Sequence, residues 1–198
     1  MLNVYEYFDE PKSLNLHDKI EPALQYVTQL YRWGASVSKE DLEPIKGLIL
    51  KNPKLIFYYT HEVIEGRWPE AEHIIAKDPS YAYSYALYVI KGPFKDAEPY
   101  IAEDPSMSVS YATNVLDGRF EESEAGILKT GDVRIITKYA ESAIKGPWPE
   151  AESIIMKDPF AAYMYAKYCL KKRWNEAEPT IKSNSEVWND YRSHFKFE

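Results

Sequence analysis

Gly66-Arg67-Trp68-Pro69-Glu70-Ala71-Glu72 is the segment that decides the fold, because close copies of it return along the chain. The copies begin at Gly92, Gly118, Gly146 and Lys172, so successive copies start 26, 26, 28 and 26 residues apart. Asp78-Pro79 and Tyr85-Ala86 also recur in phase with it. Self-similarity at a fixed period of about 20 to 50 residues indicates a repeat architecture.

We number these copies as units one to five, and a degenerate unit around Asn52-Pro53 precedes them. Each of the six units contains one tyrosine at the same position, and together they account for residues 40 to 198. These tyrosines are Tyr59, Tyr85, Tyr111, Tyr139, Tyr165 and Tyr191. Residues 1–39 lack the motif, and we expect them to form an atypical amino-terminal cap, because an end repeat must cover its apolar face.

Each unit predicts two short helices. In unit one, Pro69 suits the first turn of a helix A that runs to about Lys77. Asp78-Pro79 supplies an N-cap and a first-turn proline for a helix B, and Gly92 suits a left-handed cap at its end. We expect helix B to begin near Pro53, Pro79, Pro105, Asp132, Pro159 and Asn184.

Apolar residues three and four positions apart give both helices one apolar stripe. Helices this short are marginal alone, so successive hairpins must stack and share a core. The sequence therefore predicts an all-α fold, an α-solenoid of about six stacked two-helix repeats in one elongated domain. We expect Ala86 and Ala166 to be tight contacts between helices, because a small residue recurs there beside a large tyrosine.

The composition is that of an ordinary globular chain: 198 residues, 45% hydrophobic and 28% charged. A formal net charge of −7 disfavours non-specific attraction to nucleic acid or an anionic membrane. No apolar run is long enough to span a membrane, and Met1–Tyr7 lacks the pattern of a secretory signal. With a single cysteine, Cys169, the chain suits a reducing environment, and we expect a cytoplasmic protein.

The unit, with Trp-Pro-Glu-Ala-Glu followed by Lys77-Asp78-Pro79 and Tyr85-Ala86, resembles a short tandem repeat of uncharacterised proteins in large tailed bacteriophages, some bacteria and giant viruses. The resemblance covers about four-fifths of the chain. Unit three departs most, with Glu121, Ser123 and Gly131-Asp132 in place of the usual residues. The resemblance implies a viral protein that acts in the host cytoplasm and has no established enzymatic family.

Residues that recur in every unit are best explained by stacking. This applies to the Tyr-Ala pairs and to the aromatic residue that precedes helix A: Trp68, Phe94, Phe120, Trp148 and Trp174. It also applies to a recurrent glutamate, which suits the helix dipole beside a neighbouring Lys or Arg: Glu72, Glu98, Glu124, Glu152 and Glu178. The alternative is a carboxylate ladder that binds a cation or a basic partner.

Function is expected where units differ. Tyrosine is favoured in protein-binding surfaces, and helix B carries extra tyrosines in two units: Tyr81, Tyr83, Tyr88, Tyr163 and Tyr168. These are our candidate protein-binding residues, although they could equally complete the packing. Tyr58, Tyr100 and Phe160 add to the aromatic excess without deciding between the two.

No pattern of catalytic or metal-ligating residues is present, and the four histidines are scattered. We expect Cys169 to be a buried structural thiol, and the paired carboxylates Glu70 and Glu72 to be solvated. The sequence thus predicts no enzyme, no catalytic residues, no metal and no cofactor.

The function that fits best is a non-enzymatic protein–protein interaction solenoid, with a concave or edge surface for its partner. The viral resemblance suggests a phage-encoded accessory or counter-defence factor. One alternative is a nucleic-acid-binding repeat protein, using late basic residues such as Lys167, Lys171 and Lys172. Another is a small-ligand binder with a pocket near unit three, where Gly126 and a lengthened loop are expected to bend the stack.

Overall fold

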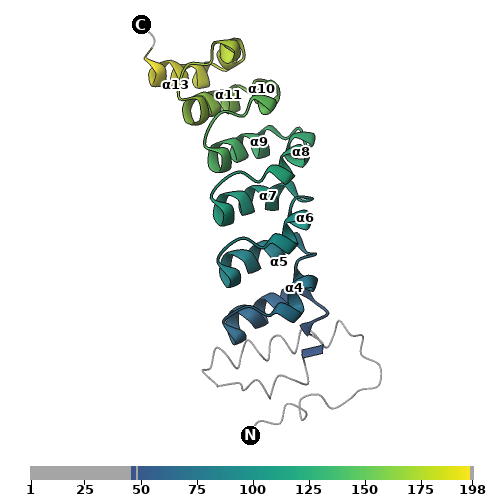
Figure 1. The fold of residues 1–198 in the computed structure, drawn as a ribbon. Coiled ribbons are helices and arrows are strands. Elements are labelled where there is room, and N and C mark those ends of the chain that lie inside the picture. The colour runs from purple at the N-terminus through teal and green to yellow at the C-terminus, as the bar shows by residue number, and fades with distance from the viewer. Residues whose placement is uncertain (1–45, 48, 197–198) are drawn as a thin grey trace, which may run out of the picture.

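A computed structural model describes residues 46–47 and 49–196 of the chain. Within these residues every regular element is a helix, and the helical pairs follow one another in a single column in chain order (Figure 1). The predicted α-solenoid is thus confirmed for this part. The expected cap over residues 1–39 lies outside the described residues.

Helix B begins where the sequence predicts, at a proline or just after an Asp or Asn cap. Its α-helical parts are α3 Pro53–Tyr58, α5 Pro79–Ser84, α7 Pro105–Tyr111, α9 Val133–Tyr139, α11 Pro159–Tyr165 and α13 Ser185–Phe195. A cap side chain accepts a backbone N–H at each start; Asp78 Oδ1, for example, accepts from Tyr81 N at 3.1 Å. The caps at Asp132 and Asn184 do the same without a following proline.

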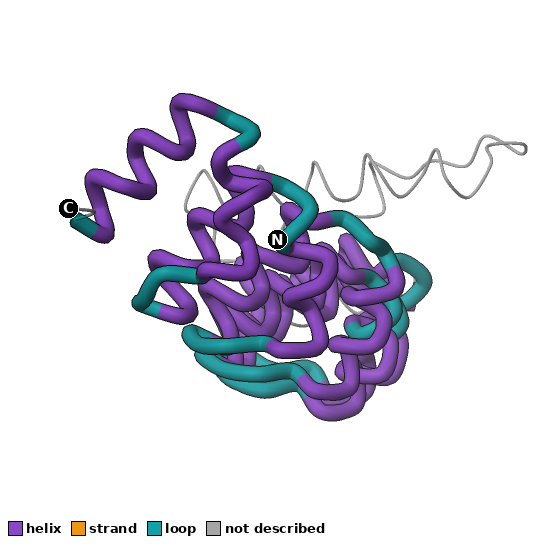
Figure 2. The backbone as a smooth tube through the Cα atoms, turned by 90° about the horizontal axis from the view of Figure 1, so that it is seen from above, coloured by secondary structure: helices purple, strands orange, loops and turns teal. Residues whose placement is uncertain are grey.

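Helix A is shorter. It comprises α4 Pro69–Ile75, α6 Glu98–Ile101, α8 Glu121–Lys129, α10 Pro149–Ile155 and α12 Glu178–Lys182, with 3-10 turns Lys95–Ala97 and Asn175–Ala177 before α6 and α12. Seen from above, the helices of successive units lie over one another while the connecting loops gather at the margins (Figure 2).

Helix B ends in a way that the sequence did not reveal. Its last turn is π-helical in the degenerate unit and in units one to four: Tyr59–Ile64, Tyr85–Ile90, Ala112–Leu116, Ala140–Ile144 and Ala166–Leu170. The N–H groups of Lys91 and Gly92 both donate to the carbonyl oxygen of Ala86. This wide turn satisfies helix-end groups that would otherwise lack partners.

The predicted left-handed cap at Gly92 is wrong by one residue. Lys91 has φ 58° and is the left-handed residue, whereas Gly131 is the one glycine in the described part with a positive φ. Glu65, Asp117, Lys145 and Lys171 repeat the geometry of Lys91 in the other units. A Cβ added to Gly92 would meet nothing within 4 Å, and Lys172 fills the same place in unit five.

The core consists of the residues that recur. The tyrosines of units one to five are fully buried, and the aromatic residues before helix A are at most 6% exposed. Ala86 and Ala166 are 0% exposed, which agrees with the tight contacts between helices predicted there. Cys169 is a buried free thiol, and burial raises its pKa to about 12.

Unit three keeps its place in the stack. Helix α8 continues through Gly126, and the two additional residues form a turn in which Gly131 takes φ 64°. A Cβ on Gly126 would meet the carbonyl oxygen of Ala102 at 3.5 Å, an ordinary contact. The two additional residues are thus accommodated in the turn, and α7, α8 and α9 follow one another as the other helices do (Figure 1).

Candidate functional surface

One hydrogen-bonded arrangement joins the recurring residues to one another. The hydroxyl of Tyr85 accepts from the backbone N–H of Trp68 at 2.9 Å and donates to the Glu72 carboxylate at 2.9 Å. The ring of the same tyrosine packs on Phe94, the aromatic residue of the next unit's motif, with ring centroids 5.4 Å apart. Tyr85 therefore links the helix A before it to the one after it.

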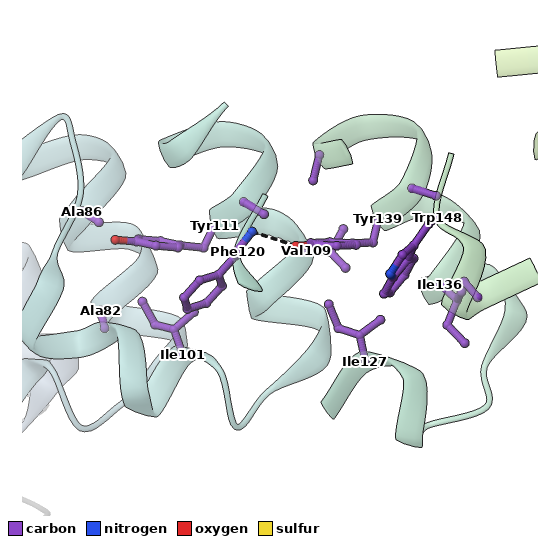
Figure 3. Close-up of a cluster of buried hydrophobic side chains, with 14 of the residues drawn as sticks. Ala82, Ala86, Ile101, Val109, Tyr111, Phe120, Ile127, Ile136, Tyr139 and Trp148 are labelled. Carbon is purple, nitrogen blue, oxygen red and sulfur yellow. Dashed lines mark hydrogen bonds between the residues drawn. The ribbon is translucent and has the colours of Figure 1, made fainter. Parts of the chain in front are cut away.

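The arrangement repeats with nearly constant geometry. Tyr139 accepts from Phe120 N at 2.7 Å and packs on Trp148 at 5.1 Å between ring centroids (Figure 3). The backbone N–H of Trp174 donates to Tyr191 at 2.8 Å in unit five. Burial raises the pKa of Tyr85 to about 12, so this hydroxyl keeps its proton at neutral pH. The recurrence of the tyrosines and glutamates predicted that both belong to the framework, but not that they bind each other.

In most units a basic side chain forms an ion pair with the recurrent glutamate. Arg67 donates from Nε and Nη2 to the two oxygens of Glu72, at 2.8 and 2.7 Å. This guanidinium, together with the tyrosine hydroxyl, holds the pKa of Glu72 below its ordinary value against the opposing effect of burial. The expectation that Glu72 is solvated was wrong, since the residue is 8% exposed. The arginine comes from the same unit rather than from a neighbour.

The candidate tyrosines fall into three groups. Tyr88 and Tyr168 are surface residues, 53% and 45% exposed. Tyr81 and Tyr83 are half-buried and pack against the core. Tyr163 is 7% exposed and contacts the ring of Tyr191, with centroids 5.9 Å apart, so its ring is not available to a partner.

The large apolar side chains that are exposed in the described residues all lie on one face of helix B. They are Tyr58, Tyr88, Phe160 and Tyr168. Relative to the buried tyrosine of their unit, they stand five residues before, one before or three after it. Positions four apart share a helix face. We call this set of three positions per unit the outer stripe.

The outer stripe changes character from unit to unit. It is polar in units two and three, where it holds Ser106, Ser110, Asn114 and then Arg134, Lys138, Ser142. In unit four it is apolar throughout, with Phe160, Met164 and Tyr168. The tyrosine pattern alone does not reveal this change, because tyrosines occur both at positions that face the core and at positions that face away from it. A spacing of four counted from the residue just before the buried tyrosine would have found it.

A second aromatic group lies at the other end of the described stack. Phe57 contacts Tyr58, Tyr81 and Tyr88, with ring centroids 5.4, 6.3 and 6.3 Å apart. His61 stacks on Phe57 at 5.5 Å. The exposed edges of Tyr58 and Tyr88 are thus held in place by rings from the degenerate unit and unit one.

Polar residues of the outer stripe also make contacts between neighbouring helices B. Asn114 donates to the hydroxyl of Tyr83 at 2.9 Å, and the hydroxyls of Thr113 and Ser142 are 2.9 Å apart. In unit three, Thr137 Oγ1 and Glu141 Oε1 are buried atoms without a hydrogen-bond partner. Burial raises the pKa of Glu141 above its ordinary value.

Two surface hollows lie around units four and five. One, of about 670 Å³, is bordered by Lys182, Trp188 and Arg192, and the Lys182 ammonium lies 4.7 Å from the Trp188 ring centre. The other, of about 530 Å³, lies between Glu152 and the start of unit five. Among the residues that the structure describes, no group of His, Cys, Asp and Glu side chains could hold a metal ion. No helix in the described part is long and apolar enough to cross a membrane.

Comparison with family models, curated proteins and solved structures found no match for this chain. What the protein binds must therefore be inferred from its own surface.

Proposed function

We propose that this protein is a non-enzymatic solenoid that binds another protein through the outer stripe of helix B. Phe160, Met164 and Tyr168 are the observation that carries the proposal, because they give one helix a continuous apolar face directed away from the core. Phe160 and Tyr168 are 59% and 45% exposed. Contiguous exposed apolar surface on a soluble protein marks an interaction site more often than chance placement.

The surroundings of this face suggest the chemistry of the partner. Helices α9 and α11 are neighbours in the stack, so Arg134 and Lys138 of unit three lie beside Phe160 and Met164 at matching positions. Both basic residues are exposed. A partner segment with apolar side chains flanked by acidic ones would fit, because opposite charges at the rim favour encounter and correct register.

The late basic residues give less support to nucleic acid as the ligand. Arg173 binds Glu178 through two donor nitrogens, and Lys182 lies 3.6 Å from the same carboxylate. Lys167 lies over the rings of Tyr163 and Tyr168, 5.6 and 5.0 Å from their centres. The repeat resemblance supports, in addition, a phage-encoded accessory or counter-defence role in the host cytoplasm.

Affinity purification of the tagged protein from its native host, with and without nuclease, tests this function. The decisive comparison is with a double variant, Phe160→Ser with Tyr168→Asn, which copies the residues that unit two carries at these positions. We expect a nuclease-resistant protein partner that the wild-type chain captures and the variant loses.

Lys77→Ala with Lys129→Ala serves as the matched control, because both side chains are exposed and lie off the outer stripe. It should retain the partner, with helical circular dichroism unchanged in both variants. A partner that survives the stripe variant, or that disappears with nuclease, would contradict the proposed function.

A further inference from the structure

One unit lacks the basic residue that forms an ion pair with the recurrent glutamate in the other units. Arg67, Arg119 and Arg173 reach Glu72, Glu124 and Glu178 with Nη2 at 2.7, 2.6 and 2.7 Å. In unit two, Pro93 replaces the arginine, but Lys95 reaches Glu98 at 2.9 Å instead. Every one of these carboxylates therefore has a basic partner within its own unit.

Unit four has neither arrangement. Its motif reads Gly146-Pro147-Trp148-Pro149-Glu150, so prolines stand both where unit one has Arg67 and where unit two has Lys95. The carboxylate of Glu152 accepts from the Tyr165 hydroxyl at 3.1 Å and makes no ion pair within the described residues. The framework contact is kept while the charge partner is absent.

Open space borders this carboxylate. Glu152 lines the hollow of about 530 Å³, together with Trp174 and Glu176 from the start of unit five. Arg173 also lines it, but its guanidinium is engaged with Glu178. Lys172 lines it without forming an ion pair with Glu152. Glu152, Glu176 and Trp174 thus border space that a flat cation could enter.

We propose that the hollow beside Glu152 binds the guanidinium of an arginine side chain supplied by a protein partner. The internal template is Arg67, whose Nε and Nη2 each meet one oxygen of Glu72. Such paired hydrogen bonds are specific to a planar guanidinium and are not reproduced by an ammonium. That the arginine belongs to a protein rests on the proposed function; the guanidinium site itself does not.

A titration of the full chain tests the site without the natural partner. The probe is the blocked peptide acetyl-Gly-Arg-Gly-amide, followed by amide and indole NMR signals, with citrulline and lysine analogues as comparisons. The arginine peptide should shift the signals of Glu152 and of residues 170–176. The neutral citrulline peptide should leave them in place, and the lysine peptide should bind more weakly.

Two variants should weaken binding of the arginine peptide for different reasons. Pro147→Arg makes the motif of unit four identical to that of unit one and supplies the guanidinium from within the chain. Glu152→Gln removes the charge but keeps an acceptor for Tyr165. Each should weaken binding of the arginine peptide by about tenfold or more, since hydrogen bonds to charged groups are the strong ones.

Glu124→Gln is the control, because Arg119 already occupies that carboxylate and the peptide should bind this variant as it binds the wild type. Equal binding by the citrulline or lysine peptide would overturn the proposal. So would undiminished binding by Pro147→Arg or Glu152→Gln with the fold intact. Failure here, with the partner still lost in the outer-stripe variant, would refute the guanidinium site and leave the proposed function standing.

Discussion

At the scale of single residues, the recurring tyrosine does more than fill space. Its ring packs forward on the next unit, and its hydroxyl bonds backward to a helix start and a carboxylate, as Tyr85 does with Trp68 and Glu72. A phenylalanine would keep the packing and lose both hydrogen bonds. This explains why the position is tyrosine in all six units although the surroundings are apolar.

Replacing Tyr85 by Phe should lower the free energy of unfolding by about 1 to 3 kcal/mol, because it leaves the Trp68 N–H buried without an acceptor. Urea denaturation measures the loss. Tyr88→Phe removes a hydroxyl from an exposed ring and should stay within about 0.5 kcal/mol of wild type. Equal effects of the two changes would show that the buried hydroxyl contributes nothing.

Glu141 is a residue that the stack would be more stable without. One carboxyl oxygen is buried and unpartnered, and the neighbouring unit carries Thr113 at the matching position. Glu141→Leu, which copies Leu87 of unit one, should raise stability at pH 7 by about 1 kcal/mol, because it removes an unsatisfied buried polar group.

The stability contribution of Glu141 also depends on pH. In the folded state the pKa of Glu141 is raised above its value in the unfolded chain, which is about 4.3. As pH rises, the folded state therefore keeps this proton longer than the unfolded state does. This contribution to stability is full below pH about 4 and is lost as pH rises through the folded pKa. The advantage of Glu141→Leu over wild type should therefore grow between pH 4 and 7. An advantage that shrinks over this range would contradict the assignment.

At the scale of the element, the close approach of helices B depends on the alanine that follows the buried tyrosine in units one to four. Ala86→Leu should overpack the stack and cost about 1 to 3 kcal/mol in chemical denaturation. The same change at the exposed Ala125 of α8 should cost less than about 0.5 kcal/mol. If Ala86→Leu were as harmless as Ala125→Leu, the contact would be looser than its burial indicates.

The end of helix B is the element whose geometry departs from the sequence-based prediction. Lys91 carries the left-handed conformation at a cost of about 1 kcal/mol for a residue with a side chain, so Lys91→Gly should increase stability by about that amount. Gly92→Ala should be neutral or slightly stabilising, because nothing crowds that position. Thermal unfolding of both variants shows whether Lys91 or Gly92 is the left-handed residue. Marked destabilisation by Gly92→Ala would indicate that it is Gly92.

At the scale of the whole molecule, the features that recur in every unit could be predicted from the sequence. The period, the helix starts at proline or Asp and Asn caps, and the buried columns were all readable, because stacking forces the same solution on every unit. The π-helical turn was not, since Tyr85-Ala86 looks the same in an α-helical or a π-helical turn. The outer stripe was found only in part, because Tyr88 and Tyr163 carry the same residue type while one is exposed and the other buried.

The central claim is that recurring positions build the stack while the varying outer stripe of helix B binds a protein. Site-specific photo-crosslinking in the native host tests it most directly, with the photoreactive residue at position 168 or, as control, at the exposed Ser153 of α10. We predict a discrete, nuclease-resistant protein adduct from position 168 and none from position 153. Adducts of equal yield from both positions, or adducts to nucleic acid alone, would contradict the claim.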